Sequence, residues 1–193
     1  MKVGIFIYEN AEVLDFSGPF EVFSTATRVS GQPDRFEPFL VAETLDPVAA
    51  RAGYTVVPDF DFGSHPKIDL LVVVGGVHEP QMERAGVIDW ISTQAKRASH
   101  VASVCTGAFL LAKAEVIRDQ SVTTHWEDIE DLRRNFPALD VLEEQRWVDA
   151  ASVTTSAGIS AGIDMSLHLV RTFADATLAE RTARKMEYDW RDQ

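Results

Sequence analysis

Continuous apolar runs alternate along this chain with segments whose apolar residues recur at helical spacing. The continuous runs, rich in valine, isoleucine and leucine, occupy residues 2–8, 36–42, 68–74 and 101–104, and they predict strands covered on both faces of a sheet. Helical spacing is marked by Phe20, Phe23 and Ala26, by Val87, Ile91 and Ala95, by Ala108, Leu111 and Ala112, by Ile163, Leu167 and Val170, and by Leu178, Thr182 and Met186. The pattern predicts an α/β domain with a mostly parallel sheet.

Shorter β-like segments bounded by turn residues interrupt this alternation. Residues 44–58 and 146–155 each predict a hairpin, and residues 121–124 predict a short strand. Residues 126–135 are expected to form a helix with Asp128 on its wetted side. The chain contains neither internal repeats nor low-complexity segments.

The stretch 101–111 holds the only cysteine of the chain and organises the expected site. Its β-forming run stops at Cys105, and a helical pattern begins at Gly107, so the segment predicts a strand, a sharp turn and a helix. Free N–H groups and the dipole at the start of that helix would favour a thiolate and a developing oxyanion. A buried cysteine that acts only as a small hydrophobe is the alternative. The close backbone approach that Gly107 allows, and the hydroxyl of Thr106, favour a reactive thiol.

Two further groups are expected at the same edge of the sheet. Asp15 follows the first strand, in a loop before a helix that Ser17 and Pro19 are expected to start. The carboxyl edge of a doubly wound sheet carries the site, so Asp15 is either an acid of that site or a group that caps the helix. Gly75 and Gly76 end the strand 68–74, where their amides face a ligand or simply allow a strand-to-helix turn.

A serine-hydrolase pattern, G-x-S-x-G, occurs at residues 158–162. The order of a hydrolase triad requires a histidine well downstream of Ser160, and only His168 follows. We place His168 on the helix that Ser160 introduces, from which it could not return as a base. The glycines are therefore expected to allow close helix packing under the site.

The five histidines show no spacing typical of a metal motif, and no metal site is expected. They are His65, His78, His100, His125 and His168. His125 differs from the others because its place at the end of a strand could bring it towards Cys105, where a Cys/His pair is a conventional means of thiol activation.

Composition limits the classes of function. The 193 residues are 46% hydrophobic and 25% charged, which is ordinary for one soluble globular domain over residues 1–193. With no membrane-spanning run, no secretory signal and a single cysteine, the chain is expected in the cytoplasm. A net charge of −12 without a basic stripe argues against nucleic-acid binding.

Several of these motifs together resemble the ThiJ/PfpI superfamily of class I glutamine amidotransferase-like proteins, and within it the isocyanide hydratases. The motifs are LDFSGP at 14–19, GG at 75–76, SVCTG at 103–107, TTHW at 123–126, GISAGID at 158–164 and EY at 187–188. They run in order over essentially the whole chain.

The resemblance implies a flavodoxin-like three-layer α/β sandwich, normally a homodimer, with Cys105 as nucleophile at a strained elbow. It also implies Asp15 as the acidic partner and Thr106 as a hydroxyl that positions this acid. The expected reaction adds water to an isocyanide through a covalent thioimidate on Cys105 and releases an N-substituted formamide. It needs a small-molecule substrate and no metal or organic cofactor, and Gly75, Gly76 and His125 are the expected substrate-binding residues.

Two other functions fit the same motifs. One is a non-enzymatic thiol sensor or ligand-binding domain, like the amidase-like domain of AraC-type regulators, whose helix-turn-helix region would have no room before Gln193. The other is a glyoxalase or deglycase acting on small carbonyl compounds. Glyoxalase-like members and proteases of the superfamily usually have glutamate at the position of Asp15, and the proteases have histidine after the cysteine. Hydratases usually have proline at the position of Val74 and small residues at 77–78, so a different pocket shape is expected here.

Overall fold

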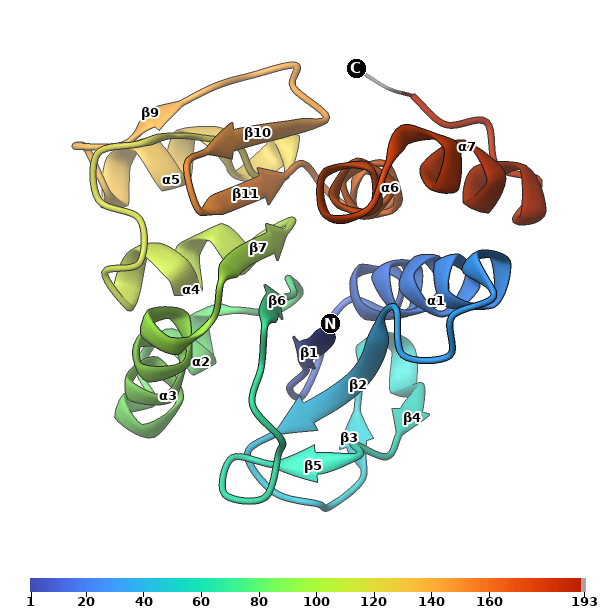
Figure 1. Cartoon of the computed structure of the whole chain (residues 1–193). Helices are drawn as coiled ribbons and strands as arrows, with labels where there is room; N and C mark the ends of the chain where they lie inside the picture. The colour runs from blue at the N-terminus through green and yellow to red at the C-terminus, as the bar shows by residue number, and fades with distance from the viewer. Residues whose placement is uncertain (192–193) are drawn as a thin grey trace.

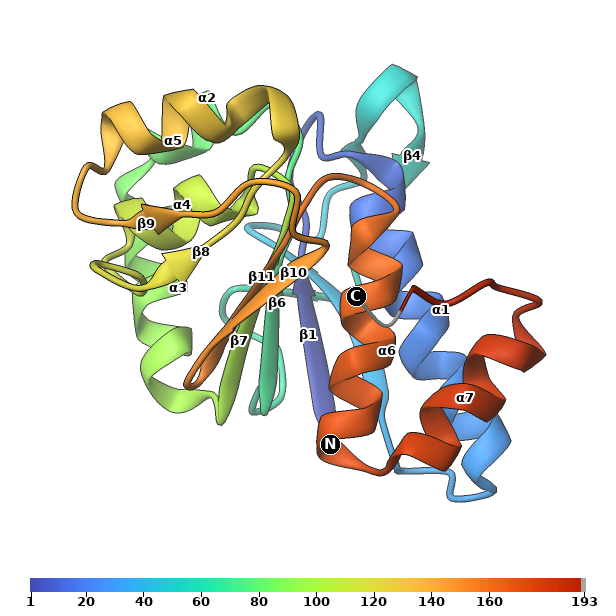
Figure 2. The ribbon, with the colours of Figure 1, turned by 90° about the horizontal axis from the view of Figure 1, so that it is seen from above.

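A central sheet lies between two layers of helices in the computed structural model, which describes residues 1–191 (Figures 1 and 2). Its seven strands are ordered β10-β11-β7-β6-β1-β2-β5, and every neighbouring pair is parallel except β10 with β11. The strands are β1 (Lys2–Phe6), β2 (Glu37–Ala42), β5 (Phe60–Asp61), β6 (Leu70–Val73), β7 (His100–Val104), β10 (Trp147–Ala150) and β11 (Val153–Ser156).

Helices cover both faces of this sheet. One layer consists of α1 (Val13–Ser30), α6 (Ala161–Phe173) and α7 (Ala176–Lys185), and the other of α2 (Glu79–Met82), α3 (Ala85–Arg97), α4 (Gly107–Lys113) and α5 (Ile129–Asn135). The expected three-layer α/β fold with a mostly parallel sheet is confirmed.

Two short strand pairs lie outside the main sheet. β3 (Val48–Ala49) and β4 (Thr55–Val56) form the expected peripheral hairpin, whereas β8 (Ser121–Val122) pairs in parallel with β9 (Asp140–Val141). The second expected hairpin is β10 and β11, which belongs to the main sheet.

The core is built on the central strands, whose side chains are buried on both faces. Every residue of β6 and β7 is buried, and the largest fully buried side chains include Phe6, Phe23, Phe36 and Phe109. Each such aromatic or aliphatic side chain contributes about 1.5–3 kcal/mol on burial. The packed frame therefore holds the carboxyl ends of β1, β6 and β7 in fixed positions.

The start of α1 differs from the expectation. The helix begins at Val13, so Asp15 lies in its first turn and not in a preceding loop, and Pro19 lies inside the helix. Tertiary contacts set this start: the N–H of Glu12 donates to the Gly75 carbonyl at 2.9 Å, and Ala11 forms a β-bridge with Gly76. Such contacts override local start signals.

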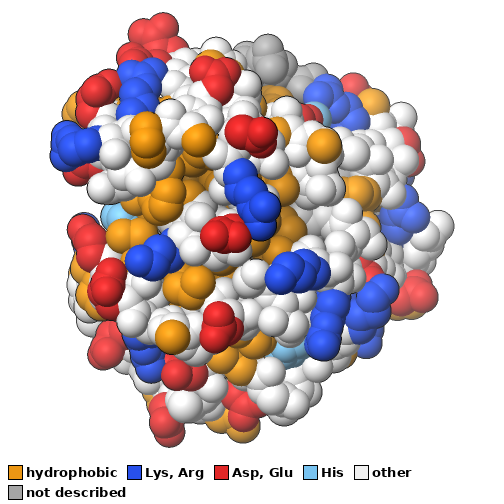
Figure 3. Space-filling view, turned by 90° about the vertical axis from the view of Figure 1, so that its left-hand side faces the viewer, with side chains coloured by type: hydrophobic (Ala, Val, Ile, Leu, Met, Phe, Trp, Pro, Cys, Tyr) orange, Lys and Arg blue, Asp and Glu red, His pale blue; other side chains and the backbone are white. Residues whose placement is uncertain are grey.

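The side of the molecule formed by α2 to α5 faces the viewer in Figure 3. Lys and Arg side chains are interspersed there with Asp and Glu and are not gathered into a stripe. Within residues 1–191, each helix is too short or too polar to cross a lipid bilayer.

Candidate active site

Cys105 occupies the expected turn between β7 and α4. Its φ of 54° lies in the left-handed region, which is strained for a residue other than glycine. Its N–H donates to the carbonyls of Ser156 (3.2 Å) and Ala157 (3.3 Å), and its own carbonyl accepts from Thr124 Oγ1 (2.8 Å). These bonds fix the strained backbone and leave the thiol at the carboxyl edge of the sheet.

The start of α4 depends on a glycine. A Cβ atom at Gly107 would lie 2.2 Å from the carbonyl oxygen of Val73, so no larger residue fits without moving β6 or α4. The close backbone approach expected at Gly107 is confirmed.

Asp15 is fully buried in the first turn of α1, beside this elbow. Its Oδ2 accepts from the N–H of Gly75 at 3.0 Å, and its Oδ1 has no hydrogen-bond partner among the described residues. Burial raises the pKa of Asp15 to about 8, against the opposing effect of the Gly75 N–H. The carboxyl is thus held in its protonated form at neutral pH. It accepts from no described N–H of its own helix, so it is not a hydrogen-bonding cap, although it lies in the first turn, where an acidic residue at a helix N-terminus stands.

The thiol of Cys105 also favours its neutral form. Burial first, and then the charge of Asp15, raise its pKa well above the ordinary value, whereas the backbone N–H groups of Thr106 and Ile159 act in the opposite direction. Only 7% of Cys105 is exposed. Burial therefore favours the protonated form of both acids; the charge of Asp15 adds to this at Cys105, whereas the Cys105 thiol acts in the opposite direction on the pKa of Asp15.

Gly75 and Gly76 connect the acid to the elbow. A Cβ atom at Gly75 would lie 2.8 Å from Cys105 Cβ, so the missing side chain lets the two segments touch. The N–H of Gly76 donates to Thr106 Oγ1, which in turn donates to the Gly76 carbonyl, both at 3.0 Å. Thr106 thus has no described hydrogen bond to Asp15 and is linked to it only through the glycine pair. Both glycine N–H groups already have protein acceptors, so neither is free for a ligand, and substrate contact with this pair stays a prediction.

His125 is bonded away from the thiol. Its Nδ1 accepts from the N–H of Glu127 at 3.3 Å and lies 3.4 Å from a carboxylate oxygen of Asp128. Its ring packs on Gly158, where a Cβ atom would lie 2.0 Å from His125 Cδ2. No hydrogen bond within residues 1–191 joins it to Cys105, so a direct role as base gains no support, and its contact with substrate stays a prediction.

Two groups that act on the thiol, Asp128 and the backbone N–H of Ile159, were not assigned to the site from sequence, and neither was the buried His78. Asp128, expected on a wetted face, is half-buried; burial raises its pKa, and its charge contributes to raising that of Cys105. His78 is buried with its ring centroid 4.3 Å from that of Phe109. Ile159 has a φ of 54°, an outlier for a β-branched residue. Only the spacing of Asp128 three residues after a candidate histidine could have indicated it.

The serine pattern has the structural role expected of it. Ser160 is exposed, and its Oγ lies 3.4 Å from the Arg146 guanidinium. His168, on α6, pairs instead with Asp149 of β10, at 2.6 Å. Gly162 packs against the end of β7. Neither the Arg146 contact nor the Asp149 pair joins Ser160 to His168, so a Ser160 triad gains no support. Residues 1–191 contain no group of three or more His, Cys, Asp or Glu arranged to hold a metal ion.

Comparison with known proteins places this geometry in a family. The family described as DJ-1/PfpI matches residues 1–172. The isonitrile hydratase of Pseudomonas putida is 31% identical over 189 residues, which are 97% of this chain and 78% of that protein. The HTH-type transcriptional regulator GbdR of Pseudomonas aeruginosa is 24% identical over 169 residues, 88% of this chain and 46% of the regulator. A crystal structure of a ThiJ/PfpI family protein from Pseudomonas syringae has a TM-score of 0.86 at 29% identity and covers 97% of this chain and 75% of that one. The chain therefore belongs to the DJ-1/PfpI family.

Proposed function

We propose that this protein is an isocyanide hydratase, which converts R–NC and water into R–NH–CHO. The observation that carries the proposal is the pairing of Cys105 with a fully buried, protonated Asp15 whose Oδ1 has no described partner. The carbon of an isocyanide is a weak electrophile until it gains a proton. It therefore needs a nucleophile and an acid at the same place, and these two residues supply both.

In the first step the sulfur of Cys105 attacks the terminal carbon of the isocyanide. The Asp15 carboxyl gives its proton to that carbon, and the thiol proton passes to Asp15 and replaces the one given. The product is a thioimidate, R–N=CH–S, on Cys105. The backbone N–H groups of Thr106 and Ile159, which lower the pKa of the thiol, stabilise negative charge on the sulfur as it loses its proton.

In the second step water adds to the thioimidate carbon. Asp15 gives a proton to the nitrogen and takes one from the water, forming R–NH–CH(OH)–S on Cys105. The C–S bond then breaks as the hydroxyl becomes a carbonyl, and the hydroxyl proton returns through Asp15 to the sulfur. The formamide leaves, and both residues regain their starting protonation states.

The similarity to the isonitrile hydratase of Pseudomonas putida supports this reaction, because it extends over 97% of the chain. The similarity to a transcriptional regulator supports a second candidate, a ligand-binding domain that uses the same pocket without turnover.

The test is to incubate the protein with a simple aryl isocyanide and, separately, with methylglyoxal, and to measure formamide and lactate. Formamide alone is the expected result. Lactate alone would replace the proposal with a glyoxalase activity, and neither product would favour the ligand-binding domain.

We further propose that the protein is a homodimer. Leu14 and Ile159 are large apolar side chains that are 36% and 37% exposed beside the site, where a second copy could cover them. Light scattering that gives 21.4 kDa, the mass of one chain, at all concentrations would contradict this.

A further inference from the structure

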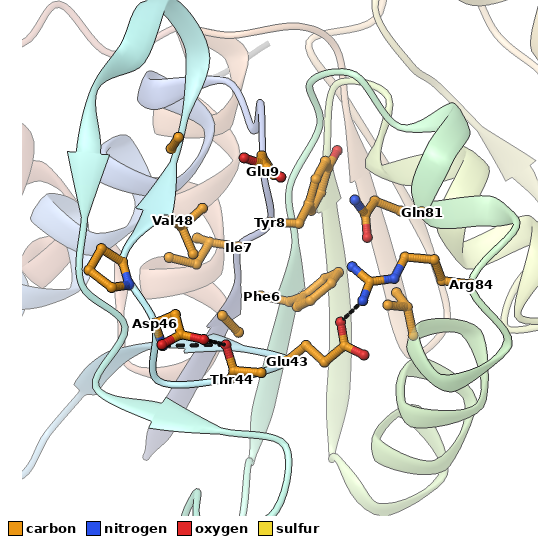
Figure 4. A pocket seen from close by; sticks show the side chains of 14 residues that line it. Phe6, Ile7, Tyr8, Glu9, Glu43, Thr44, Asp46, Val48, Gln81 and Arg84 are labelled. Carbon is orange, nitrogen blue, oxygen red and sulfur yellow. Dashed lines mark hydrogen bonds and ion pairs between the residues drawn. The ribbon is translucent and has the colours of Figure 1, made fainter.

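A pocket lies at the carboxyl ends of β1 and β2, on the side of α2 and α3 (Figure 4). Its open space is about 600 Å³, and it is lined by residues 6–9, residues 42–44 and 46–49, Gln81, Arg84 and Val87. Neither Cys105 nor Asp15 lines it. Tyr8 forms part of its wall, and the Tyr8 hydroxyl donates to the carbonyl of Val74 at 3.2 Å. The charges of Asp15 and Cys105 contribute, after burial, to raising the pKa of Tyr8, so the pocket adjoins the candidate active site without containing its two acids.

The lining of this pocket is acidic at both ends and apolar between them. Figure 4 shows Glu9 at one end, Glu43 and Asp46 at the other, and the side chains of Phe6 and Val48 between them. The only basic side chain of the lining is Arg84, and it is already paired with Glu43. Three carboxylates against one guanidinium leave a local charge of −2, within a chain whose net charge is −12. Such a lining attracts cations and repels anions.

Gln81 gives the pocket a specific polar requirement. It is 5% exposed, and its side chain extends from α2 towards the strand residues of the pocket (Figure 4). Its Oε1 has no hydrogen-bond partner among the described residues. A buried carbonyl oxygen without a donor is unfavourable, so the amide lacks an N–H or O–H donor that a bound molecule can supply.

We propose that this pocket binds a small primary alkylammonium ion, with an N–H donated to the Gln81 amide oxygen and the alkyl chain along the apolar wall. The carboxylates of Glu9 and Asp46 supply the attraction for the positive charge. A quaternary ammonium ion has the same charge but no N–H donor, and an alcohol has a donor but no charge. Both features together therefore define the ligand class.

The test is calorimetric titration of the purified protein, at low ionic strength, with n-butylammonium, tetramethylammonium, 1-butanol and butyrate. We expect saturable binding of n-butylammonium, with the other three at least about tenfold weaker, because a hydrogen bond to a charged group accounts for a factor of that size. Added salt should weaken the binding.

Two variants with matched controls locate the site. Gln81→Leu should weaken n-butylammonium binding about tenfold or more, whereas Gln94→Leu, at another buried glutamine that lies on α3 outside the pocket, should leave it unchanged. Asp46→Asn, at an exposed position, should weaken it by about twofold to fivefold, and Asp34→Asn should not. Circular dichroism checks that each variant is folded.

Four results would overturn the proposal: absence of saturable binding, equal affinity for tetramethylammonium, tighter binding of butyrate, or unchanged affinity in folded Gln81→Leu. Formamide production by the same preparations is measured separately. Because the pocket contains neither Cys105 nor Asp15, failure here leaves the hydratase proposal intact, and the reverse also holds.

Discussion

The polar groups at the two ends of β7 differ in how completely their hydrogen bonds are made. At the amino end, His100 Nε2 lies 2.8 Å from Thr154 Oγ1, which donates to Asp149 Oδ1 at 2.6 Å. The other oxygen of Asp149 pairs with His168 Nε2 at 2.6 Å. Just beyond the carboxyl end lie Cys105 and its neighbouring acid, whose Oδ1 has no described partner. At the amino end the polar groups form a connected hydrogen-bond network, whereas at the carboxyl end one carboxyl oxygen of Asp15 has no described hydrogen bond.

This difference separates stability from reactivity. His168 lowers the pKa of Asp149, so that carboxylate is charged and bound in place, whereas burial raises the pKa of Asp15, so that carboxyl keeps a proton it can give away. A satisfied network stabilises the fold, and an unsatisfied buried acid destabilises it. A catalytic role for Asp15 would explain why an unfavourable buried acid stands at the carboxyl end of β7.

The largest expected effect is at the sulfur. Cys105→Ala should lower kcat for isocyanide hydration by more than about 10⁴-fold, because the nucleophile is lost. Cys105→Ser should be nearly as inactive, since a hydroxyl is scarcely ionised near neutral pH. Steady-state kinetics measures both, and wild-type activity in either variant would remove Cys105 from the mechanism.

Asp15→Asn should lower kcat by at least about a hundredfold, within the usual range for loss of a general acid. Asparagine can still accept the Gly75 N–H, so the variant should fold normally. In the wild type, kcat should fall as the pH rises through about 8, because Asp15 then loses its proton.

Iodoacetamide alkylation distinguishes loss of the acid from damage to the elbow. The charge of Asp15 raises the pKa of Cys105, so Asp15→Asn should be alkylated at pH 9 at least as fast as the wild type. Near wild-type turnover in this variant would return Asp15 to a structural role.

At the other end of β7, Thr154→Val should affect stability and not activity. The change removes the hydroxyl between His100 and Asp149, and we expect a loss of about 1–3 kcal/mol in the free energy of unfolding. Urea denaturation measures it, with exposed Thr177→Val as the control. A severalfold loss of kcat in Thr154→Val would show that the two ends are not independent.

The pH dependences of stability should be opposite for Asp15 and Asp149. Folded Asp15 keeps its proton to about pH 8, whereas in the unfolded chain it loses it near the model-peptide value of 3.8. Between these two pH values Asp15 is ionised only in the unfolded chain. The free energy of unfolding therefore falls as the pH rises through this window, by at most about 1.4 kcal/mol per pH unit. Asp15→Asn should gain stability relative to the wild type over this range and then level off.

Asp149 should behave in the reverse way. Its pKa is lowered in the folded state, so its contribution to stability is present above its ordinary pKa and is lost as the pH falls through the folded value. Asp149→Asn should thus be destabilised at neutral pH and converge with the wild type in acid. Parallel pH profiles for the two variants in denaturant titrations would contradict the contrast between the two ends.

The sequence was most informative where the packing pattern is long. The strand residues of β6 are apolar throughout and those of β1 and β7 are mostly so. Their burial was therefore predicted, and the switch from strand to helix at Cys105 followed from the same pattern. The elements β5, β9 and α2, of two to four residues, are too short to show a period and were not predicted.

The sequence supplied the candidate residues of the site but not the contacts among them. The burial of Asp128 and the left-handed backbone of Ile159 depend on tertiary contacts, and the residue type indicates neither of them. The bonds of Gly75 and Gly76 to Asp15 and Thr106 were also beyond the sequence, because a glycine pair fits a ligand loop and a simple turn equally well.

Gly75 also limits how this site can diverge over evolutionary time. A single-nucleotide change from glycine to alanine would place a methyl group against Cys105 Cβ and move the nucleophile away from its proton donor. The same methyl group would lie 2.6 Å from the backbone nitrogen of Thr106, so the start of α4 would also have to move. Under the proposed mechanism, position 75 is thus one at which a single substitution would lower turnover while both Cys105 and Asp15 remain in the chain.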